Sequence, residues 1–304
     1  MSHFATLVIH KEGADIDEIL APFCETDEDF FEFYDFTDEI KKEYSAVTVK
    51  RVKMPDGKYY NYGDKIFAKK VSKEEYYKNQ NGFRSYISSG RNGLNTEYIL
   101  CDYIEKGGAL VDVPAKEIMT LGEYAEYCGY CKYKQDENIP DEDAVFGYYF
   151  NPNAEWDWFE IGGRWNNSIK TKSGVFCNSC KIGEIDFTPD ERKMEINRRF
   201  WEIVVNKEPL KEGEKKPFCF YTEEYLKKLY GDKETYALCN SSFSTYSILT
   251  PDGEWLEPGT MGWFGISSAT ANEEREWYKS YQSTIKKFAE ENPDYVVTLV
   301  DCHI

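Results

Sequence analysis

The chain has 304 residues and a formal net charge of −18, which comes from 55 acidic and 37 basic residues. This excess of acid disfavours direct binding to nucleic acid and to anionic membranes. Hydrophobic residues make up 41% of the sequence, too many for an intrinsically disordered chain. The sequence shows no secretory leader and no stretch of roughly 20 apolar residues, the length that spans a membrane. We therefore expect a globular protein of the cytoplasm.

The first half of the chain predicts more strands than helices. Residues 3–10 are apolar and β-branched, which is typical of a strand, and residues 45–53 alternate as a second strand. Pro55-Asp56-Gly57 predicts a turn that returns the chain into residues 58–62. Residues 70–95 are polar and predict a helix followed by irregular structure.

Helix signals become clearer in the middle of the chain. Thr120 is placed to cap a short helix that ends at Tyr127, and residues 146–150 predict a strand. The run from Thr188 to Glu191 has Thr at the N-cap, Pro at the first position and Glu three residues on, which predicts a helix to about Val205.

The last third predicts two more helices, a hairpin and a final strand. Residues 222–230 form a helical pattern that Gly231 ends, and residues 245–256 form a hairpin around a Pro-Asp-Gly turn. Residues 272–291 predict the longest helix and residues 295–304 the last strand.

These elements predict an α+β fold with a mixed, largely antiparallel sheet and packed helices, since there is no regular βαβ alternation. The closing helix and strand predict that the last strand returns to the sheet beside the first one. No internal repeat or long linker is present. We therefore expect a single domain over residues 1–304, with an inserted region near residues 120–185 that resembles a zinc knuckle.

That inserted region contains two C-x-x-C pairs. Nine cysteines in a cytoplasmic protein indicate thiols or metal ligands rather than disulfides. The first pair is Cys128 and Cys131, and the second is Cys177 and Cys180, after an interval of 45 residues. Together they could supply four thiolates to a structural zinc ion. Unlinked thiols remain an alternative because the interval is long for a zinc ribbon. A redox dithiol is disfavoured because Cys128 would follow a helix, not begin one.

The three histidines, His3, His10 and His303, all lie in the two terminal strands. If those strands pair, His3 and His303 could approach Asp301 and Cys302 and form an acid–base or metal site. The alternative is that these are ordinary strand side chains.

Residues 151–165 are rich in tryptophan and glycine. Alternation along a strand places Trp156 and Trp158 on one face and Asp157 on the other. Arg164 follows two glycines and could pair with Asp157 or stack on an indole. The segment is either a ligand-contacting site or an aromatic corner of the core, and the structural interpretation is favoured.

The negative charge is concentrated in two segments. Residues 11–43 carry 13 acidic and 3 basic residues, a net charge of −10, and residues 136–143 add five acidic residues. Six aromatic residues are interleaved with the first group: Phe23, Phe30, Phe31, Phe33, Tyr34 and Phe36. A solvated surface explains any one of these carboxylates. As a group, they are the candidate surface for a partner.

Several motifs resemble a widespread group of bacteriophage-encoded proteins. They are the start MSHF-x-x-LVI, the segment NPNA-x-WDW-x-x-IGGRW at residues 151–165, GWFG at residues 262–265 and the ending VDCHI. The resemblance covers essentially the whole chain, and the cysteine pairs are not a universal part of its pattern. In length and acidity the chain is also similar to phage inhibitors of the Gabija defence system, a nuclease–helicase complex. That resemblance implies stoichiometric binding to a host complex in the host cytoplasm, without turnover, and leaves a homo-oligomer open.

The sequence thus favours an interaction protein that blocks the nucleic-acid site of a host defence complex. Carboxylates can occupy a basic groove shaped for phosphates, and phenyl rings supply anchoring area. The predicted partner-binding residues are Glu25, Asp27, Glu28, Asp29, Phe31, Glu32 and Asp35. The first alternative is a phage enzyme that acts on nucleotides or nucleic acid through the terminal His/Asp/Cys cluster. A structural or regulatory phage protein with zinc as its only cofactor is the second.

Overall fold

The computed structural model describes residues 2–79, 83–89 and 96–304. It has the α+β fold that the sequence predicts, with mostly antiparallel strand pairs. The chain divides into two compact units: unit 1 comprises residues 1–31 and 150–304, and unit 2 comprises residues 32–149. The sequence predicted one domain with an insertion near residues 120–185. The chain passes between the units at residues 31–32 and 149–150. Both places are rich in aromatic residues and lack the composition that is typical of a linker.

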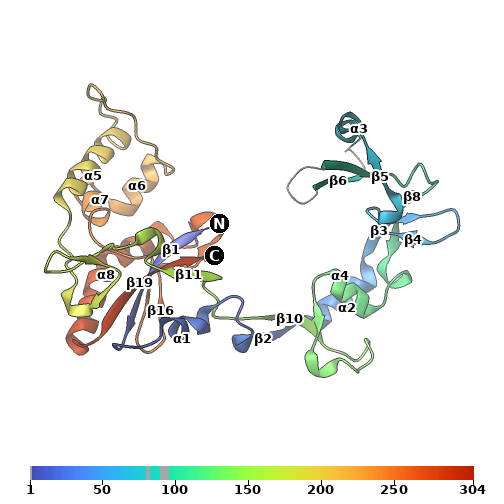
Figure 1. Cartoon of the computed structure of the whole chain (residues 1–304), viewed down its shortest axis with the longest axis horizontal. Coiled ribbons are helices and arrows are strands. Elements are labelled where there is room, and N and C mark those ends of the chain that lie inside the picture. Colours follow the sequence, from blue (N-terminus) through green and yellow to red (C-terminus); the bar gives the residue numbers. More distant parts are fainter. Residues whose placement is uncertain (1, 80–82, 90–95) are drawn as a thin grey trace. The chain divides into compact units, whose positions relative to one another are not determined.

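Unit 1 is built on a six-stranded sheet within the described residues (Figure 1). Its strands, in spatial order, are β11 (Trp158–Ile161), β19 (Val296–His303), β1 (His3–His10), β15 (Ser247–Leu249) and β16 (Trp255–Leu256), and β14 (Ser179–Lys181) pairs with β19 beyond the end of β11. β1 and β19 pair antiparallel over their whole length, from His3 opposite His303 to His10 opposite Val296. The predicted adjacency of the terminal strands is confirmed. β15 runs parallel to β1.

The two faces of this sheet carry separate cores because successive side chains of a strand point to opposite faces. On one face Leu7 and Ile9 pack with Tyr281 and Ile285 of α8 (Ala271–Glu291). On the other face Phe4, Val8, Val300 and Cys302 pack with Leu20 of α1 (Ile16–Leu20). Every residue of β1 after His3 is buried, so this strand contributes side chains to both cores.

The remaining helices of unit 1 are α5 (Glu191–Val204), α6 (Glu223–Tyr230) and α7 (Lys233–Cys239). The prediction that α5 begins at Thr188 is wrong. Asp190 is the N-cap and accepts a hydrogen bond from the Lys193 N–H at 3.1 Å. Two good capping residues stand close together here, and the one that reaches a backbone N–H sets the start. Thr222 caps α6 and Gly231 ends it with φ of 81°, as predicted.

Unit 2 contains smaller sheets and short helices, each with its own buried cluster. Its helices are α2 (Thr37–Ala46), α3 (Lys73–Lys78) and α4 (Leu121–Tyr127). In the first three-stranded sheet β10 (Phe146–Phe150) lies between β2 (Glu32–Asp35) and β9 (Cys131–Lys132), and in the second β3 (Thr48–Lys53) lies between β4 (Tyr59–Tyr60) and β8 (Ala109–Pro114). In the third, β7 (Thr96–Cys101) lies between β5 (Ala68–Val71) and β6 (Arg84–Ser89). The predicted cap of α4 by Thr120 is confirmed, and Glu123 completes a capping box with it. Residues 84–89 are a strand, where the sequence predicted irregular structure, and residues 80–82 and 90–95 lie outside the described part.

Two short hairpins complete unit 1: β12 (Ile169–Lys170) with β13 (Phe176–Cys177), and β17 (Met261–Gly262) with β18 (Ile266–Ser267). Within the described residues, no helix has the length and apolar character needed to cross a membrane.

Candidate functional site

Three segments that are far apart in the sequence meet at one end of the sheet of unit 1. His3 of β1 lies opposite His303 of β19, and Trp158 of β11 lies opposite His303 on the other side. These three residues therefore form a row across neighbouring strands on one face of the sheet. Two residues further along, Asp301 occupies the same face of β19. We name this group, together with Asp157, the histidine–carboxylate cluster.

Each histidine of the cluster is held by a carboxylate. His3 Nδ1 lies 2.8 Å from Asp301 Oδ1, and His303 Nδ1 lies 2.6 Å from Asp157 Oδ1. An ionised carboxylate only accepts hydrogen bonds, so the Nδ1–H group is the donor in both pairs. This leaves the Nε2 atom of each ring as the nitrogen that can meet a ligand or a reacting group.

The indole of Trp158 lies against both imidazoles. It stacks on His303 with 5.0 Å between ring centroids and 20° between ring planes. It meets the edge of His3 at 5.3 Å and 83°, and the two imidazole centroids are 4.9 Å apart. Trp158 is 45% exposed and His303 only 6% exposed. The indole therefore covers buried rings while presenting its own surface to solvent.

Asp301 is the most deeply buried member of the cluster, at 2% exposed. Its second oxygen, Oδ2, accepts a hydrogen bond from the backbone N–H of Arg164 at 2.8 Å. A Cβ atom on Gly163 would lie 2.4 Å from the Asp301 side chain, and Gly163 has φ of 42°. Glycine is required here because the backbone approaches the carboxylate closely. The Gly-Gly-Arg run of the sequence thus provides a donor to a buried charge.

His303 Nε2 is buried and has no hydrogen-bond partner among the described residues. With Nδ1–H donated to Asp157, Nε2 is a bare lone pair in the neutral ring. An unsatisfied buried polar atom costs about 1–3 kcal/mol of stability. Trp156 Nε1 and Ser242 Oγ share this condition among the described residues. A water molecule, a ligand or a substrate that hydrogen-bonds to His303 Nε2 would remove the cost.

The predicted cluster of terminal histidines and Asp301 is present, but Cys302 is not part of it. Cys302 points to the opposite face, is fully buried, and accepts a hydrogen bond from Thr6 Oγ1 at 3.4 Å. Burial raises the pKa of its thiol to about 12, so the thiolate nucleophile is not formed at neutral pH. Asp157, and not the predicted Cys302, is the second acidic neighbour of the histidines. The sequence offered no signal for this, because nothing in it shows which strand lies beside β19.

Residues 151–165 differ from their predicted arrangement. Trp156 and Trp158 were expected on one strand face, but Trp156 precedes β11 and is buried in the second core against Phe159, with 5.1 Å between centroids. Arg164 was expected to pair with Asp157 or to stack on an indole. Asp157 instead pairs with His303, and Arg164, which is exposed, has no ion pair among the described residues.

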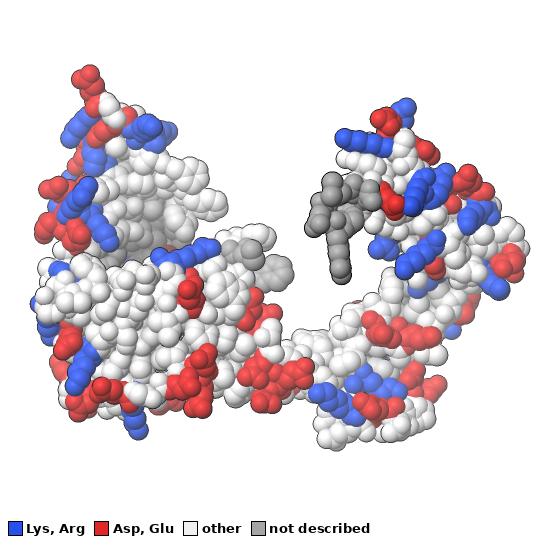
Figure 2. All heavy atoms as spheres, in the orientation of Figure 1, with Lys and Arg blue, Asp and Glu red and all other residues white. Residues whose placement is uncertain are grey.

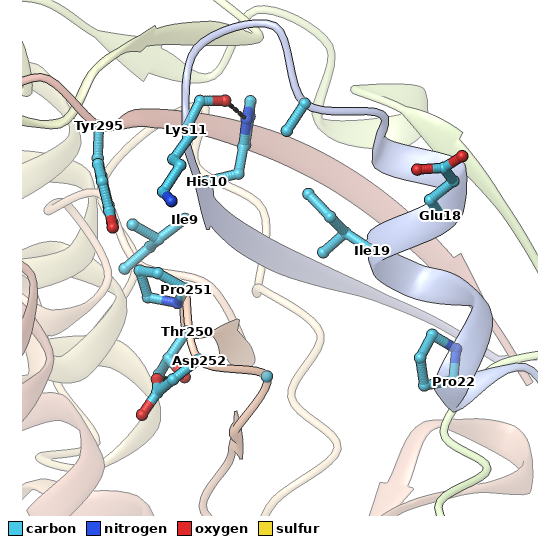
Figure 3. A pocket seen from close by; sticks show the side chains of 12 residues that line it. Ile9, His10, Lys11, Glu18, Ile19, Pro22, Thr250, Pro251, Asp252 and Tyr295 are labelled. Carbon is cyan, nitrogen blue, oxygen red and sulfur yellow. Dashed lines mark hydrogen bonds between the residues drawn. The ribbon is translucent and has the colours of Figure 1, made fainter.

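His10 lies at the opposite end of β1, beside a cavity of about 470 Å³ (Figure 3). The cavity is lined by apolar side chains from β1 and α1 and by charged groups of both signs, including Lys11 and Asp252. His10 Nδ1 donates to the Lys11 carbonyl at 2.8 Å, and Nε2 lies 2.8 Å from Thr298 Oγ1. Both nitrogens are engaged, so His10 has a structural role and lends no acid–base group to the cavity.

The acidic–aromatic segment, which we define as residues 25–35, joins the end of α1 to β2. Glu25, Glu28, Asp29, Glu32 and Asp35 are exposed, whereas Asp27 and Phe31 are half-buried. Phe30 and Tyr34 are 37% and 44% exposed. Figure 2 shows acidic and basic side chains on the visible surface of each unit. The predicted partner-binding residues are thus mainly accessible, with aromatic rings among them.

The carboxylates of this segment are not locked into salt bridges within the described part of the chain, although the positive charge of Lys41 acts on Asp35. Among the described residues, none of them forms an ion pair. By contrast, Arg199 of α5 is surrounded by Glu202, Glu208 and Glu214 at 3.4, 3.2 and 2.7 Å. Two aspartates of the segment make local turns instead: Asp27 accepts from the Asp29 N–H, and Asp35 accepts from the Thr37 N–H. Hydrogen bonds from Thr37 lower the pKa of Asp35.

The four predicted zinc ligands are divided between the units. Cys128 and Cys131 belong to unit 2, and Cys177 and Cys180 belong to unit 1. Burial and the neighbouring Cys177 raise the pKa of Cys180, which disfavours its thiolate. Within the described residues no group of three or more His, Cys, Asp or Glu side chains is arranged to hold a metal ion. The zinc site stays a prediction from spacing alone.

Comparison with known proteins finds no protein-family model, no curated protein and no solved structure that matches this chain. The resemblance to the phage-encoded group therefore stays a prediction.

Proposed function

We propose that this protein is a phage-encoded inhibitor that binds a host nuclease–helicase defence complex of the Gabija type and blocks its nucleic-acid site. Binding is stoichiometric and takes place in the host cytoplasm. The observation that carries the proposal is the acidic–aromatic segment, whose carboxylates, apart from the half-buried Asp27, are exposed and have no ion pair among the described residues. The resemblance of the chain to phage-encoded proteins supports the identity of the partner.

A surface that binds nucleic acid is basic, because it must neutralise phosphates. Carboxylates that form no ion pair within the described residues keep their charge available for an encounter with such a surface and speed association. Charge alone gives little affinity once it is screened by salt. Phe30 and Tyr34, which are partly exposed between the carboxylates, supply the apolar anchors that interface hot spots require.

The test neutralises the segment without changing its shape. In the variant D27N/E28Q/D29N/E32Q/D35N, asparagine keeps the local capping hydrogen bonds that Asp27 and Asp35 make. We expect its affinity for a purified Gabija-type complex to fall by at least about 100-fold, because several charge contacts are lost together. Inhibition of DNA cleavage by that complex should be lost in parallel.

A charge-matched control carries E191Q, E195Q, E224Q, E290Q and E291Q, which remove the same number of charges from exposed helix positions of unit 1. We expect it to bind and inhibit like the wild type. If both variants inhibit equally, or if the neutralised segment still inhibits fully, the segment is not the binding surface. If the wild type does not bind such a complex, the assignment of the partner is wrong.

A further inference from the structure

We propose that the histidine–carboxylate cluster is a two-histidine acid–base site that cleaves a small ribonucleotide phosphodiester by attack of the substrate's own 2′-hydroxyl. This activity is distinct from the proposed inhibition. The cluster belongs to unit 1, and none of its members lies in the acidic–aromatic segment.

The geometry of the cluster gives the two rings separable roles. Both Nδ1 atoms are committed to carboxylates, so the two Nε2 atoms are the reactive positions. His303 Nε2 is a bare, buried acceptor without a partner among the described residues, which suits a general base. Asp301 is 2% exposed, so its charge is weakly screened and is placed to stabilise an imidazolium on His3. His3 is therefore the general acid.

The surroundings of the two rings indicate the class of substrate. Trp158 offers a half-exposed indole face on which a nucleobase can stack. Arg164, whose backbone N–H is fixed to Asp301, carries an exposed guanidinium without an ion pair in the described chain, and guanidinium groups suit phosphate oxygens. With a net charge of −18, the protein repels long polyanions, so a substrate with a single phosphodiester fits best.

Cys302, the thiol that the sequence analysis placed near the histidines, does not serve as a nucleophile here: it points to the opposite face and has a pKa of about 12 because it is buried. In the proposed step the attacking group comes with the substrate, since the 2′-hydroxyl of a ribonucleotide lies next to the phosphorus that it attacks. A deoxyribonucleotide lacks this group and is not a substrate.

The proposed step is balanced without a further reactant. His303 Nε2 takes the proton of the 2′-hydroxyl, and the 2′-oxygen forms a bond to phosphorus. The bond from phosphorus to the 5′-oxygen breaks, its electron pair stays on the 5′-oxygen, and that oxygen takes a proton from His3 Nε2. The products are a 2′,3′-cyclic phosphate and a free 5′-hydroxyl. Exchange of protons with solvent restores the two histidines.

Access to His303 depends on Trp158. The indole is stacked on His303, so the 2′-hydroxyl reaches Nε2 only when the indole shifts. Trp158 lies on β11 at the edge of the sheet, where a side chain can move without disturbing a core. An arriving base replaces the imidazole as the partner of the indole.

The experiment uses the full-length protein, a 3′,5′-linked ribodinucleoside monophosphate and its 2′-deoxy analogue, in EDTA to suppress contaminating nucleases. We expect the wild type to release the 2′,3′-cyclic nucleotide from the ribo substrate only. H3N and H303N should each lower kcat by at least about 100-fold. The pH–rate profile should be bell-shaped in the wild type, and H303N should lose the limb that rises with pH. W158A should raise KM more than it lowers kcat.

E160Q is the matched control, since Glu160 lies opposite Asp301 on the neighbouring strand and is exposed; we expect its rate to equal that of the wild type. D157N tests a positioning role for Asp157 and should lower kcat and shift the pH–rate profile. All variants are compared by tryptophan fluorescence to establish that unit 1 is folded. Absence of cleavage by the folded wild type, or equal rates for the wild type and folded H303N, overturns the proposal. Neither result depends on whether the protein inhibits a defence complex.

Discussion

Carboxylates have opposite surroundings in the acidic–aromatic segment and in the histidine–carboxylate cluster. In the segment they are mostly exposed and have no cationic partner among the described residues. In the cluster, Asp301 is buried and receives hydrogen bonds from His3 and Arg164, and Asp157 receives one from His303. A solvated carboxylate contributes little to folding, whereas a buried one is stable only if donors surround it. Exposed carboxylates of the segment are thus available to bind a partner, whereas the carboxylates of the cluster orient the two histidines.

The largest effect should follow from removing the buried carboxylate. In D301A the His3 Nδ1–H group and the Arg164 backbone N–H lose an acceptor whose side chain is 2% exposed. We expect the free energy of unfolding of unit 1 to fall by about 3 kcal/mol. Urea denaturation followed by tryptophan fluorescence measures this unit alone, because all seven tryptophans lie in residues 150–304.

D157A is the internal control for that measurement. The Asp157 side chain is 33% exposed, so water can replace it as the acceptor for His303. We expect D157A to cost about 1 kcal/mol, the worth of an ordinary hydrogen bond. Equal losses for D301A and D157A would show that burial does not distinguish the two carboxylates.

The sequence predicts much of the frame that carries this site. β1, β19 and α8 have strong periodic patterns and clear caps or stops, and each forms close to its predicted bounds. The pairing of β19 with β1 was predicted from the long helix and the strand that end the chain. The three histidines were correctly assigned to the terminal strands, because alternation within a strand is a local property.

Tertiary neighbours were harder to predict. Asp157 meets His303 only because β11 lies beside β19, and no local pattern encodes which strands become neighbours. Trp156 was assigned to the face of Trp158 because the strand was taken to begin too early. The strand β6 of unit 2 was missed because its sequence is largely polar and its stability comes from pairing with β7.

Glu155 is a third kind of carboxylate, since it is half-buried and forms no ion pair with any described residue. Burial, and then the negative charge of Glu257, raise the pKa of Glu155 from the ordinary value of 4.5 to about 8. Between these two values the folded state holds a proton that the unfolded chain has released. The contribution of this proton to stability is complete below pH 4.5 and is lost as the pH rises through about 8.

E155Q should therefore stabilise unit 1 at alkaline pH. At pH 8.5 we expect a gain of about 1–2 kcal/mol over the wild type, allowing for partial solvation of the site. The gain should shrink toward pH 5, where the folded wild type is already protonated. Urea denaturation at several pH values measures it. The control is E254Q, an exposed glutamate of the β15–β16 hairpin; if its curve matches that of E155Q, burial of Glu155 is not the cause.

The smallest change in stability should follow from neutralising the acidic–aromatic segment, because exposed carboxylates contribute little to folding. The variant D27N/E28Q/D29N/E32Q/D35N removes carboxylates without ion pairs in the described chain and keeps the hydrogen bonds to the Asp29 and Thr37 N–H groups through asparagine. We expect the free energy of unfolding to change by no more than about 0.5 kcal/mol. Removing negative charge from a protein of net charge −18 relieves repulsion, so any change should be a gain. A decrease of more than about 1 kcal/mol in the free energy of unfolding of unit 1 would mean that these carboxylates stabilise the fold. In that case, loss of inhibition by the same variant could not be assigned to a lost contact with the partner.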